Sequence, residues 1–173
     1  MRRVNVRLLS APEVETLLPS LVDVLWDAVD GGGSLGFLAP LADADAKRYW
    51  RSLVPEIERG SRFLFVAFVG ARLVGSVQLV LSPWVNSPHR AEVQKLFVAT
   101  SLKGKGIGKA LMAAVHDTAR ERGRSLLLLN TRVGNPAEHF YRAHGYRVAG
   151  VIPGYTLGAD GERHDNLTMY RQS

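Results

Sequence analysis

The sequence predicts one mixed α/β domain that spans residues 1–173. Its predicted elements run in the order strand, two helices, three strands, helix, strand, helix and two strands, and this alternation is typical of an α/β layer architecture. A chain of 173 residues can form one domain that buries about two-thirds of its unfolded surface. Hydrophobic residues make up 46% of the chain and charged residues 22%, which is ordinary for a globular protein. No repeat or linker divides the sequence, so we predict no second domain.

The chain should begin with a strand and a helix. Residues 3–9 alternate between apolar and polar side chains, which favours a strand. Ser10 and Glu13 form a capping box, and apolar residues then recur at helical spacing as far as Leu25. The glycines at residues 31–33 should end this helix and open a loop.

A second helix is predicted after that loop. It covers residues 43–59, and Pro55 is expected to kink it because proline lacks the backbone N–H that a helix needs. Two strands should follow at residues 62–69 and 73–81, joined by a tight turn at Gly70. These elements complete the first half of the predicted sheet.

The second half should alternate strands and helices. A strand at residues 90–99 leads into a glycine-rich loop, and the helix after it has the clearest period in the chain, with apolar or small residues on one face: Ile107, Ala110, Leu111, Ala114, Val115, Thr118 and Ala119. Residues 125–129 read as an apolar strand buried on both faces, as in a parallel pairing. A short helix at residues 137–144 and a hairpin with arms at residues 146–157 and 163–171 should close the domain.

The glycine-rich loop at residues 103–109 is the most informative motif. It alternates lysines with glycines at the start of a helix, in the order Lys103, Gly104, Lys105, Gly106, Ile107, Gly108 and Lys109. Glycines let backbone N–H groups approach a ligand closely, and the helix N-terminus and the lysines add positive charge. This combination favours a phosphorylated ligand.

Two common phosphate loops do not match this motif. A Walker A loop would need glycine at Lys103 and Ser or Thr at Ala110. A dinucleotide fingerprint would need glycine at Lys109 or Leu111. The pattern that remains is a basic residue, two positions, Gly106, one position and Gly108, directly at a helix start.

That pattern resembles the acyl-CoA pyrophosphate loop of the GNAT superfamily of N-acetyltransferases. Residues 96–98 before the loop and residues 134–146 after it look like two further landmarks of the family, so the resemblance covers about the last half of the chain. It implies the acyl-CoA N-acyltransferase fold, a central and mostly antiparallel sheet with two splayed strands and flanking helices. It also implies acetyl-CoA as the acyl donor.

The resemblance implies where acetyl-CoA contacts the chain. The pantetheine arm would lie between the splayed strands, with the thioester beside the backbone of Leu96, Phe97 and Val98 and the pyrophosphate at residues 103–109. The family usually has asparagine where this chain has Gly134, and the next residue, Asn135, is therefore the expected contact with CoA.

Several stretches resemble the tabtoxin-resistance acetyltransferases within this superfamily. They are residues 29–37, 90–96 and 153–155, together with Asp160-Gly161. This closer resemblance implies that residues 31–37 help to form the acceptor pocket and that Glu92 and Tyr141 are the catalytic pair. The chain departs from that pattern at Asn130, where an aspartate is usual, because an amide cannot accept a proton as a base does.

Acetyl transfer to an amine needs a neutral amine and a proton for the departing thiolate. Tyr141 can supply the proton, and Glu92 can accept one from the amine directly or through water. Two alternatives remain open at this stage: Tyr141 packs against the cofactor arm without transferring a proton, and Glu92 pairs with Arg90 or Lys95. Because the chain has no cysteine, direct attack in a ternary complex is the simpler route.

Composition argues against several other classes of protein, namely disulfide-bonded, metal-binding, nucleic-acid-binding and membrane-spanning proteins. The absence of cysteine excludes disulfides, thiolate metal sites and a cysteine acyl-enzyme, and the five histidines show no metal-ligand spacing, so no metal is expected. The net charge of +6 is scattered rather than interleaved with stacking aromatics, which favours a basic surface over nucleic-acid binding. No apolar run approaches the roughly 20 residues of a membrane span, and a cytoplasmic location is expected.

The leading hypothesis is an acetyl-CoA-dependent N-acetyltransferase for a small-molecule primary amine, such as an amino acid-like toxin or antibiotic. The alternatives are a polyamine or protein N-acetyltransferase and a non-catalytic acyl-CoA-binding sensor, with a nucleic-acid binder third. The sequence leaves a homodimer open.

Overall fold

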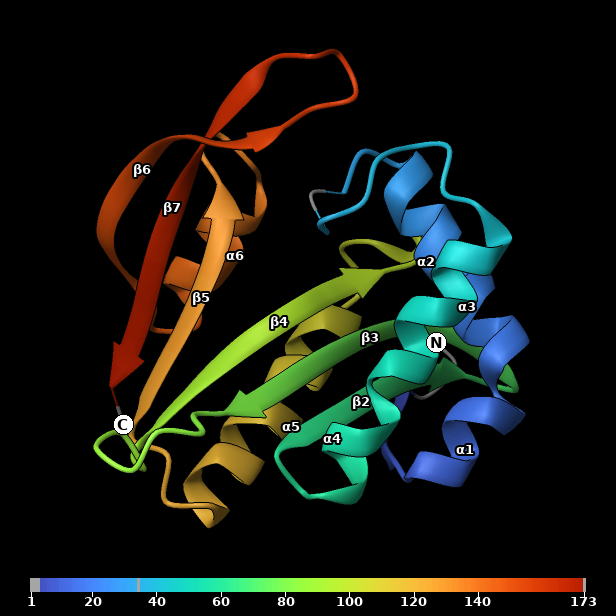
Figure 1. Cartoon of the computed structure of the whole chain (residues 1–173), viewed down its shortest axis with the longest axis horizontal. Helices are drawn as coiled ribbons and strands as arrows, with labels where there is room; N and C mark the ends of the chain where they lie inside the picture. Colours follow the sequence, from blue (N-terminus) through green and yellow to red (C-terminus); the bar gives the residue numbers. More distant parts are fainter. Residues whose placement is uncertain (1–3, 34, 173) are drawn as a thin grey trace.

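The structure, a computed structural model, describes residues 4–33 and 35–172 and forms in them a seven-stranded sheet with helices on both faces (Figure 1). The strands are β1 (Val4–Leu9), β2 (Arg62–Val69), β3 (Arg72–Leu81), β4 (Arg90–Val98), β5 (Leu126–Arg132), β6 (Arg147–Leu157) and β7 (Arg163–Gln172). They lie in the order β1-β2-β3-β4-β5-β7-β6, and in this described part of the chain the pair β4–β5 alone is parallel. The predicted mixed α/β fold with a mostly antiparallel sheet is confirmed.

The first predicted helix is in fact two helices, α1 (Ala11–Thr16) and α2 (Leu18–Asp30), with the break at Leu17. The predicted capping box at the start of α1 is present. The prediction of one continuous helix was wrong because Pro19, in the first turn of α2, has no N–H to bond a carbonyl of α1.

The second predicted helix also divides, into α3 (Asp43–Ser52) and α4 (Val54–Glu58). The division at Leu53 lies just before Pro55, so the expected kink is a full break. Trp50, a residue of α3, is completely buried. Figure 1 shows α1 to α4 gathered around β1 to β4, at the end of the sheet away from β6 and β7.

The glycine-rich loop joins β4 to α5 (Ile107–Glu121) through the short 3-10 helix η1 (Thr100–Leu102). The apolar face predicted for α5 is buried, with Leu111 and Val115 fully covered. Helix α6 (Ala137–Ala143) follows β5 and matches the prediction within one residue. No helix of residues 4–33 and 35–172 is both long and apolar enough to cross a membrane.

Strand β4 contains a bulge. Ser76 of β3 pairs with Phe97 and Gln78 pairs with Gln94, so β4 carries one residue more than β3 between these pairs. Lys95 lies in the bulge with a left-handed backbone, φ 53°. The regular alternation of the strand is therefore interrupted just before residues 96–98.

Strands β4 and β5 pair over a short distance and then separate. The parallel ladder joins Arg90, Ala91 and Glu92 to residues 126–128 and goes no further, although both strands continue. Figure 1 shows the two strands diverging from their common start. The splayed strands implied by the family resemblance are thus present, whereas the burial expected for residues 125–129 on both faces holds only in part, because Ser125 is exposed and Leu126 and Leu128 are half-buried.

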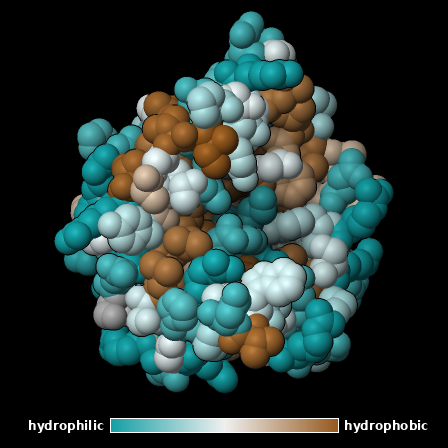
Figure 2. All heavy atoms as spheres, turned by 60° about the vertical axis from the view of Figure 1, so that its left-hand side comes forward, coloured by the Kyte–Doolittle hydropathy of each residue, from teal (hydrophilic) through white to brown (hydrophobic). Residues whose placement is uncertain are grey.

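Strand β6 is an edge of the sheet and exposes several large apolar side chains, namely Val151, Ile152, Tyr155 and Leu157. Figure 2 looks toward the side of the molecule that carries β6 and β7, and hydrophobic surface gathers in several areas of its upper half. Exposed edge strands are sites at which chains can pair, and the homodimer stays a prediction.

Candidate active site

The glycine-rich loop presents backbone N–H groups at the start of α5. Gly106 is the N-cap residue with φ 80°, and the N–H of Ala110 makes the first helical bond to its carbonyl at 3.1 Å. The N–H groups of residues 107–109 therefore have no acceptor within the helix, and they are the groups that bind anions at helix N-termini. Lys103, Lys105 and Lys109 are exposed around them. The arrangement suits a pyrophosphate.

Gly104 and Gly108 serve this loop in different ways. Gly104 has φ 77°, a conformation that L side chains rarely adopt, and open space around the position of a Cβ. A Cβ on Gly108 would instead lie 3.4 Å from the ring of Phe140. Gly108 thus lets α6 pack closely on the start of α5, which the sequence did not predict.

Residues 96–98 lie on β4 beyond the end of its ladder with β5. Phe97 and Val98 pair with β3 on one edge, and among the described residues no strand pairs with the other edge. Such an edge offers backbone N–H and C=O groups to an extended polar ligand. This separation of β4 from β5, the slot, lies at the place where the thioester was expected.

Tyr141 is a buried residue of α6, 8% exposed, with aromatic neighbours. Its ring meets those of Phe140 and Tyr146 edge to face, with centroids 5.5 and 5.8 Å away. Burial raises the pKa of Tyr141 to about 12, so its phenol stays protonated at neutral pH. Within the described residues its hydroxyl makes no hydrogen bond and keeps its proton available as a donor.

Glu92 lies where β4 and β5 separate. It is half-buried and forms the last pair of the parallel ladder, with Leu128. The predicted alternative of an ion pair is not seen among the described residues, because Arg90 bonds Ser82 at 3.5 Å and Lys95 bonds a backbone carbonyl. Among the described residues the carboxylate thus makes no salt bridge, and it lies where the two strands separate.

Asn130 follows Leu128 on the same face of β5. Its Oδ1 accepts hydrogen bonds from Asn166 Nδ2 at 2.9 Å and from Thr168 Oγ1 at 3.0 Å. Both partners lie on β7. Since the carbonyl oxygen is occupied, the amide NH₂ group is the part of Asn130 that remains for a water or a substrate.

Asn135 has a structural task that the sequence did not predict. Its Oδ1 accepts a hydrogen bond from the N–H of Ala137 at 2.9 Å and so caps the start of α6, the helix that carries Tyr141. The amide NH₂ group stays available for the CoA contact expected from the family resemblance.

The segment expected to form the acceptor pocket, residues 31–37, is described except for Ser34, which lies outside the described residues. Leu35 is buried, and Phe37 packs edge to face on Tyr49 of α3, with centroids 5.0 Å apart. Lys95 donates a hydrogen bond to the carbonyl of Leu35. The sequence analysis did not predict this contact, because Lys95 and Leu35 are far apart in the sequence.

A buried polar network supports this side of the sheet. Arg62 of β2 bonds Glu56 of α4 at 2.8 Å, and it also donates to Gln78 of β3. Gln78 in turn donates to the hydroxyl of Tyr49 at 2.7 Å. Burial raises the pKa of Tyr49 to about 12, so this hydroxyl also remains protonated. The network was not predicted, since its members are far apart in the sequence.

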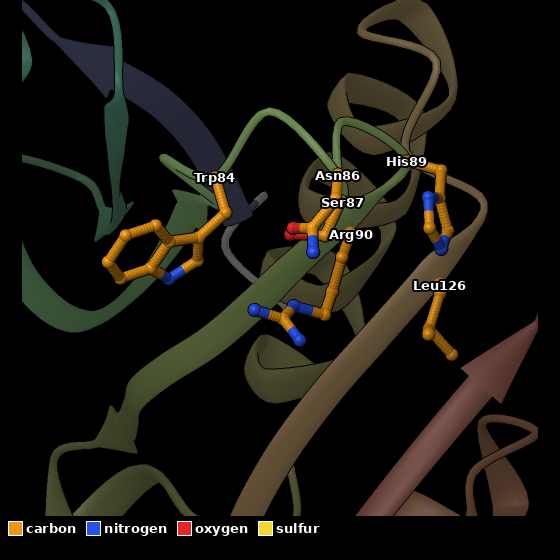
Figure 3. Close-up of a pocket in the computed structure, with 6 residues that line it drawn as sticks. All are labelled: Trp84, Asn86, Ser87, His89, Arg90 and Leu126. Atoms are coloured by element: carbon orange, nitrogen blue, oxygen red, sulfur yellow. The ribbon is translucent and has the colours of Figure 1, made fainter.

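Tyr146 and three of the histidines make contacts of their own. Tyr146 is buried, and its hydroxyl lies 3.2 Å from His116 Nε2. His164 Nε2 lies 3.5 Å from Asp160 Oδ1. His89 lines a surface cavity of about 580 Å³ at the start of β4 and β5, together with Trp84, Asn86, Ser87, Arg90 and Leu126 (Figure 3). This cavity is at the end of β4 away from the glycine-rich loop.

Comparisons with known proteins agree with this geometry. The family model described as "Acetyltransferase (GNAT) family" matches residues 32–146. The streptothricin acetyltransferase of Streptomyces lavendulae is 38% identical over 154 residues, which are 87% of this chain and 70% of that protein.

Solved structures match nearly the whole chain. A ribosomal-protein-alanine N-acetyltransferase from Brucella melitensis superposes with a TM-score of 0.80 at 23% identity, covering 98% of this chain and 99% of that one. A putative acetyltransferase from Salmonella typhimurium, solved with its cofactor acetyl-CoA, superposes with a TM-score of 0.77 at 14% identity, covering 98% and 94%. At these identities the superpositions show the shared fold.

Proposed function

The chain belongs to the acetyltransferase (GNAT) family of N-acetyltransferases, and from this premise we propose that it moves the acetyl group of acetyl-CoA to a primary amine of a small molecule by direct attack. The observation that carries the proposal is the separation of β4 from β5 directly beside the glycine-rich loop. A slot for an extended arm thus adjoins a site for a pyrophosphate.

The residues present fit the donor. The N–H groups of residues 107–109 and the three exposed lysines of the loop would hold the pyrophosphate, and the free edge of residues 96–98 would hold the pantetheine arm. Asn135 would add its amide NH₂ group. When bound, acetyl-CoA supplies an activated acetyl thioester.

Two proton transfers remain for the protein. An alkyl amine with a pKa of about 10.4 is mostly protonated at neutral pH, so the acceptor must lose a proton before it can attack. Glu92 has no ion pair among the described residues and takes this proton, directly or through water. Tyr141, protonated because burial raises its pKa to about 12, donates a proton to the departing thiolate.

The charges near Glu92 bear on the choice of acceptor. Arg62, Lys95 and Glu56 lie on the same side of the sheet, so the surroundings are not strongly acidic. A polycationic polyamine would favour an acidic lining, and the alternative of a polyamine acetyltransferase is less supported. Because the chain is 38% identical to a streptothricin acetyltransferase, we propose an amine-bearing antibiotic or toxin as the acceptor.

A thiol-release assay tests the proposal. Purified protein and acetyl-CoA are mixed with a panel of amines: streptothricin-type and aminoglycoside antibiotics, amino acid-like toxins, polyamines, and a peptide with a free N-terminus. We expect CoA release that depends on an antibiotic or toxin amine. Release with the peptide or a polyamine instead would replace the proposed acceptor class.

The variant Glu92→Gln tests the base in the same assay. We expect kcat at neutral pH to fall about 10²-fold, as is typical when general base catalysis is lost, with little change in acetyl-CoA affinity. Glu121→Gln, at an exposed position on α5, is the matched control and should keep full activity. Full activity of Glu92→Gln would remove Glu92 from the base role.

A further inference from the structure

We propose that Lys95 is a positioning residue for the acceptor, because its ammonium group fixes the acceptor loop to the strand that binds the donor. The acceptor loop is defined here as residues 31–33 and 35–41, between α2 and α3. The inference rests on the proposed function and adds to it a residue that sets the affinity for the acceptor.

The backbone of Lys95 is the first observation. Among the described residues it is the one non-glycine residue with positive φ, 53°, and it lies in the bulge of β4 next to Leu96. An L residue is strained in this conformation, whereas glycine would adopt it freely. A lysine at such a place indicates that its side chain makes contacts that glycine cannot supply.

Those contacts reach both the loop and α3. The ammonium group donates to the carbonyl of Leu35, and it lies 5.4 Å from the ring centroid of Phe37 and 5.8 Å from that of Tyr49. Both distances are within the range of cation–π attraction. One side chain thus joins β4, the acceptor loop and α3.

Gly36 shows how closely the loop fits this ammonium group. A Cβ on Gly36 would lie 3.0 Å from Lys95 Nζ, and the residue has φ 79°. Glycine therefore leaves the space in which the ammonium group lies between Leu35 and Phe37. The glycine at position 36 of the loop thus fits the lysine at position 95 of the strand.

A second contact ties the base of the loop to the donor side. The N–H of Thr100, in η1, donates to Asp27 Oδ2 at 2.6 Å, and Asp27 lies near the end of α2. A Cβ on Gly31 would lie 2.8 Å from Thr100 Oγ1. Leu35 of the loop and the end of α2, from which the loop begins, are thus bound to the chain just before and just after residues 96–98. Because the bond between Asp27 and Thr100 fixes the chain where the loop begins, loss of the Lys95 ammonium group should release only the outer part of the loop.

Kinetics of Lys95→Met provide the first test. Methionine keeps an unbranched side chain and removes the ammonium group. We expect the KM for the acceptor to rise at least tenfold, while kcat and the Kd for acetyl-CoA, measured by calorimetry, change less than threefold. Lys95→Arg should restore most of the affinity, because a guanidinium can also donate to Leu35. An unchanged acceptor KM in Lys95→Met overturns the inference.

Lys47→Met is the matched control. Lys47 is a half-buried lysine of α3 that pairs with Asp43 at 2.7 Å, and no hydrogen bond joins its side chain to the described residues of the acceptor loop. The variant Lys47→Met loses one positive charge, as Lys95→Met does, and its KM for the acceptor should equal that of the unchanged protein. An equal rise of KM in both variants would point to a general effect of charge and would overturn the role of Lys95.

Limited proteolysis tests the contact without any acetyl transfer. Chymotrypsin cleaves after Phe37 and Leu38, and Leu38 is 50% exposed. We expect Lys95→Met to be cut there about tenfold faster than the unchanged protein and Lys47→Met at the unchanged rate. Equal rates in all three proteins overturn the inference. If no amine is acetylated, the proposed function fails, yet this measurement still decides the role of Lys95.

Gly36→Ala serves if Lys95→Met does not fold. The added methyl group would displace the ammonium group while the lysine and its charge remain, and Gly32→Ala, with the same φ of 79° but open space around a Cβ, controls for backbone strain in the loop. Faster cleavage after Phe37 or Leu38 is again the expected result, and an unchanged rate contradicts the contact.

Discussion

The hydroxyl of Tyr141 is the clearest test at the scale of a residue. Because burial raises its pKa to about 12, the phenol remains a proton donor across the pH range of ordinary assays. We expect Tyr141→Phe to lower kcat about 10²-fold while the KM for acetyl-CoA changes less than twofold. Tyr146→Phe makes the same change at a buried neighbour and should retain kcat. Equal kcat in the unchanged protein and Tyr141→Phe would leave Tyr141 only its packing role.

His116 gives a prediction about stability. Burial, and then the nearby Arg171, lowers its pKa from 6.5 to about 4 in the folded protein. Between these values the unfolded chain binds a proton that the folded protein does not, so stability is full above pH 6.5 and falls as the pH drops toward 4. At pH 5 we expect a loss of about 1 kcal/mol from this group, which allows for solvent near the partly exposed ring.

Thermal unfolding of His116→Phe checks this effect. The fall in Tm between pH 7.5 and pH 5 should be smaller in the variant than in the unchanged protein, because phenylalanine binds no proton. The same fall in both proteins would show that other groups carry the pH dependence.

Single residues also show what the sequence could and could not predict of the site. Glu92 and Tyr141 were predicted through their resemblance to family motifs. Glu92 lies where β4 and β5 separate, Tyr141 is buried in α6, and their catalytic roles stay predictions. Lys95 was considered only as a partner of Glu92. Its actual partner, the carbonyl of Leu35, belongs to a segment far away in the sequence, and no local pattern reveals such a contact.

At the scale of an element, the start of α5 gives a prediction with a built-in control. Gly106 and Gly123 flank this helix with φ of 80° and 65°, and neither has a neighbour near the position of a Cβ. Alanine at either place should therefore destabilise the fold by a similar amount, about 1 kcal/mol. Only Gly106→Ala should also weaken acetyl-CoA binding in a calorimeter, since it distorts the loop that offers free N–H groups. Equal affinity in both variants would contradict the placement of the pyrophosphate.

Element boundaries were predicted well where local chemistry decides them. The capping box at Ser10, the glycine after α2 and the strong period of α5 each ended or began an element as expected. The two helix breaks were harder, since helical spacing continues through Leu17 and Leu53. The bulge at Lys95 was not predicted because it depends on how β3 and β4 pair, which sequence periodicity does not specify.

At the scale of the whole molecule, the sheet is weakest between β4 and β5. Three residue pairs join them, and beyond Glu92 the facing edges have no sheet partner. We expect amide hydrogen exchange to slow in residues 93–98 and 129–132 when acetyl-CoA binds, because the ligand fills the slot and bonds the free edge. Exchange in β2 and β3, which are paired on both sides, should change little. Protection confined to residues 103–109 would mean that the arm does not enter the slot.

The global fold was predictable because the order of strands and helices, together with the glycine-rich loop, matches one architecture. What the sequence did not supply was the set of contacts that bring distant segments together. The network of Arg62, Gln78 and Tyr49 and the tether from Asp27 to Thr100 are of this kind. They determine how the acceptor side of the sheet is built, and residue spacing carries no information on them.

The short ladder between β4 and β5 has a thermodynamic consequence. In the proposed mode of binding, the donor takes the place of the sheet pairing that the two strands lack, so it would bind the folded chain and would have no comparable site on the unfolded one. A ligand of this kind, at a concentration 100 times its Kd, adds about 2.7 kcal/mol to the free energy of unfolding. The melting temperature of the protein should therefore depend on the supply of acetylated cofactor around it, and its lifetime would vary with that supply.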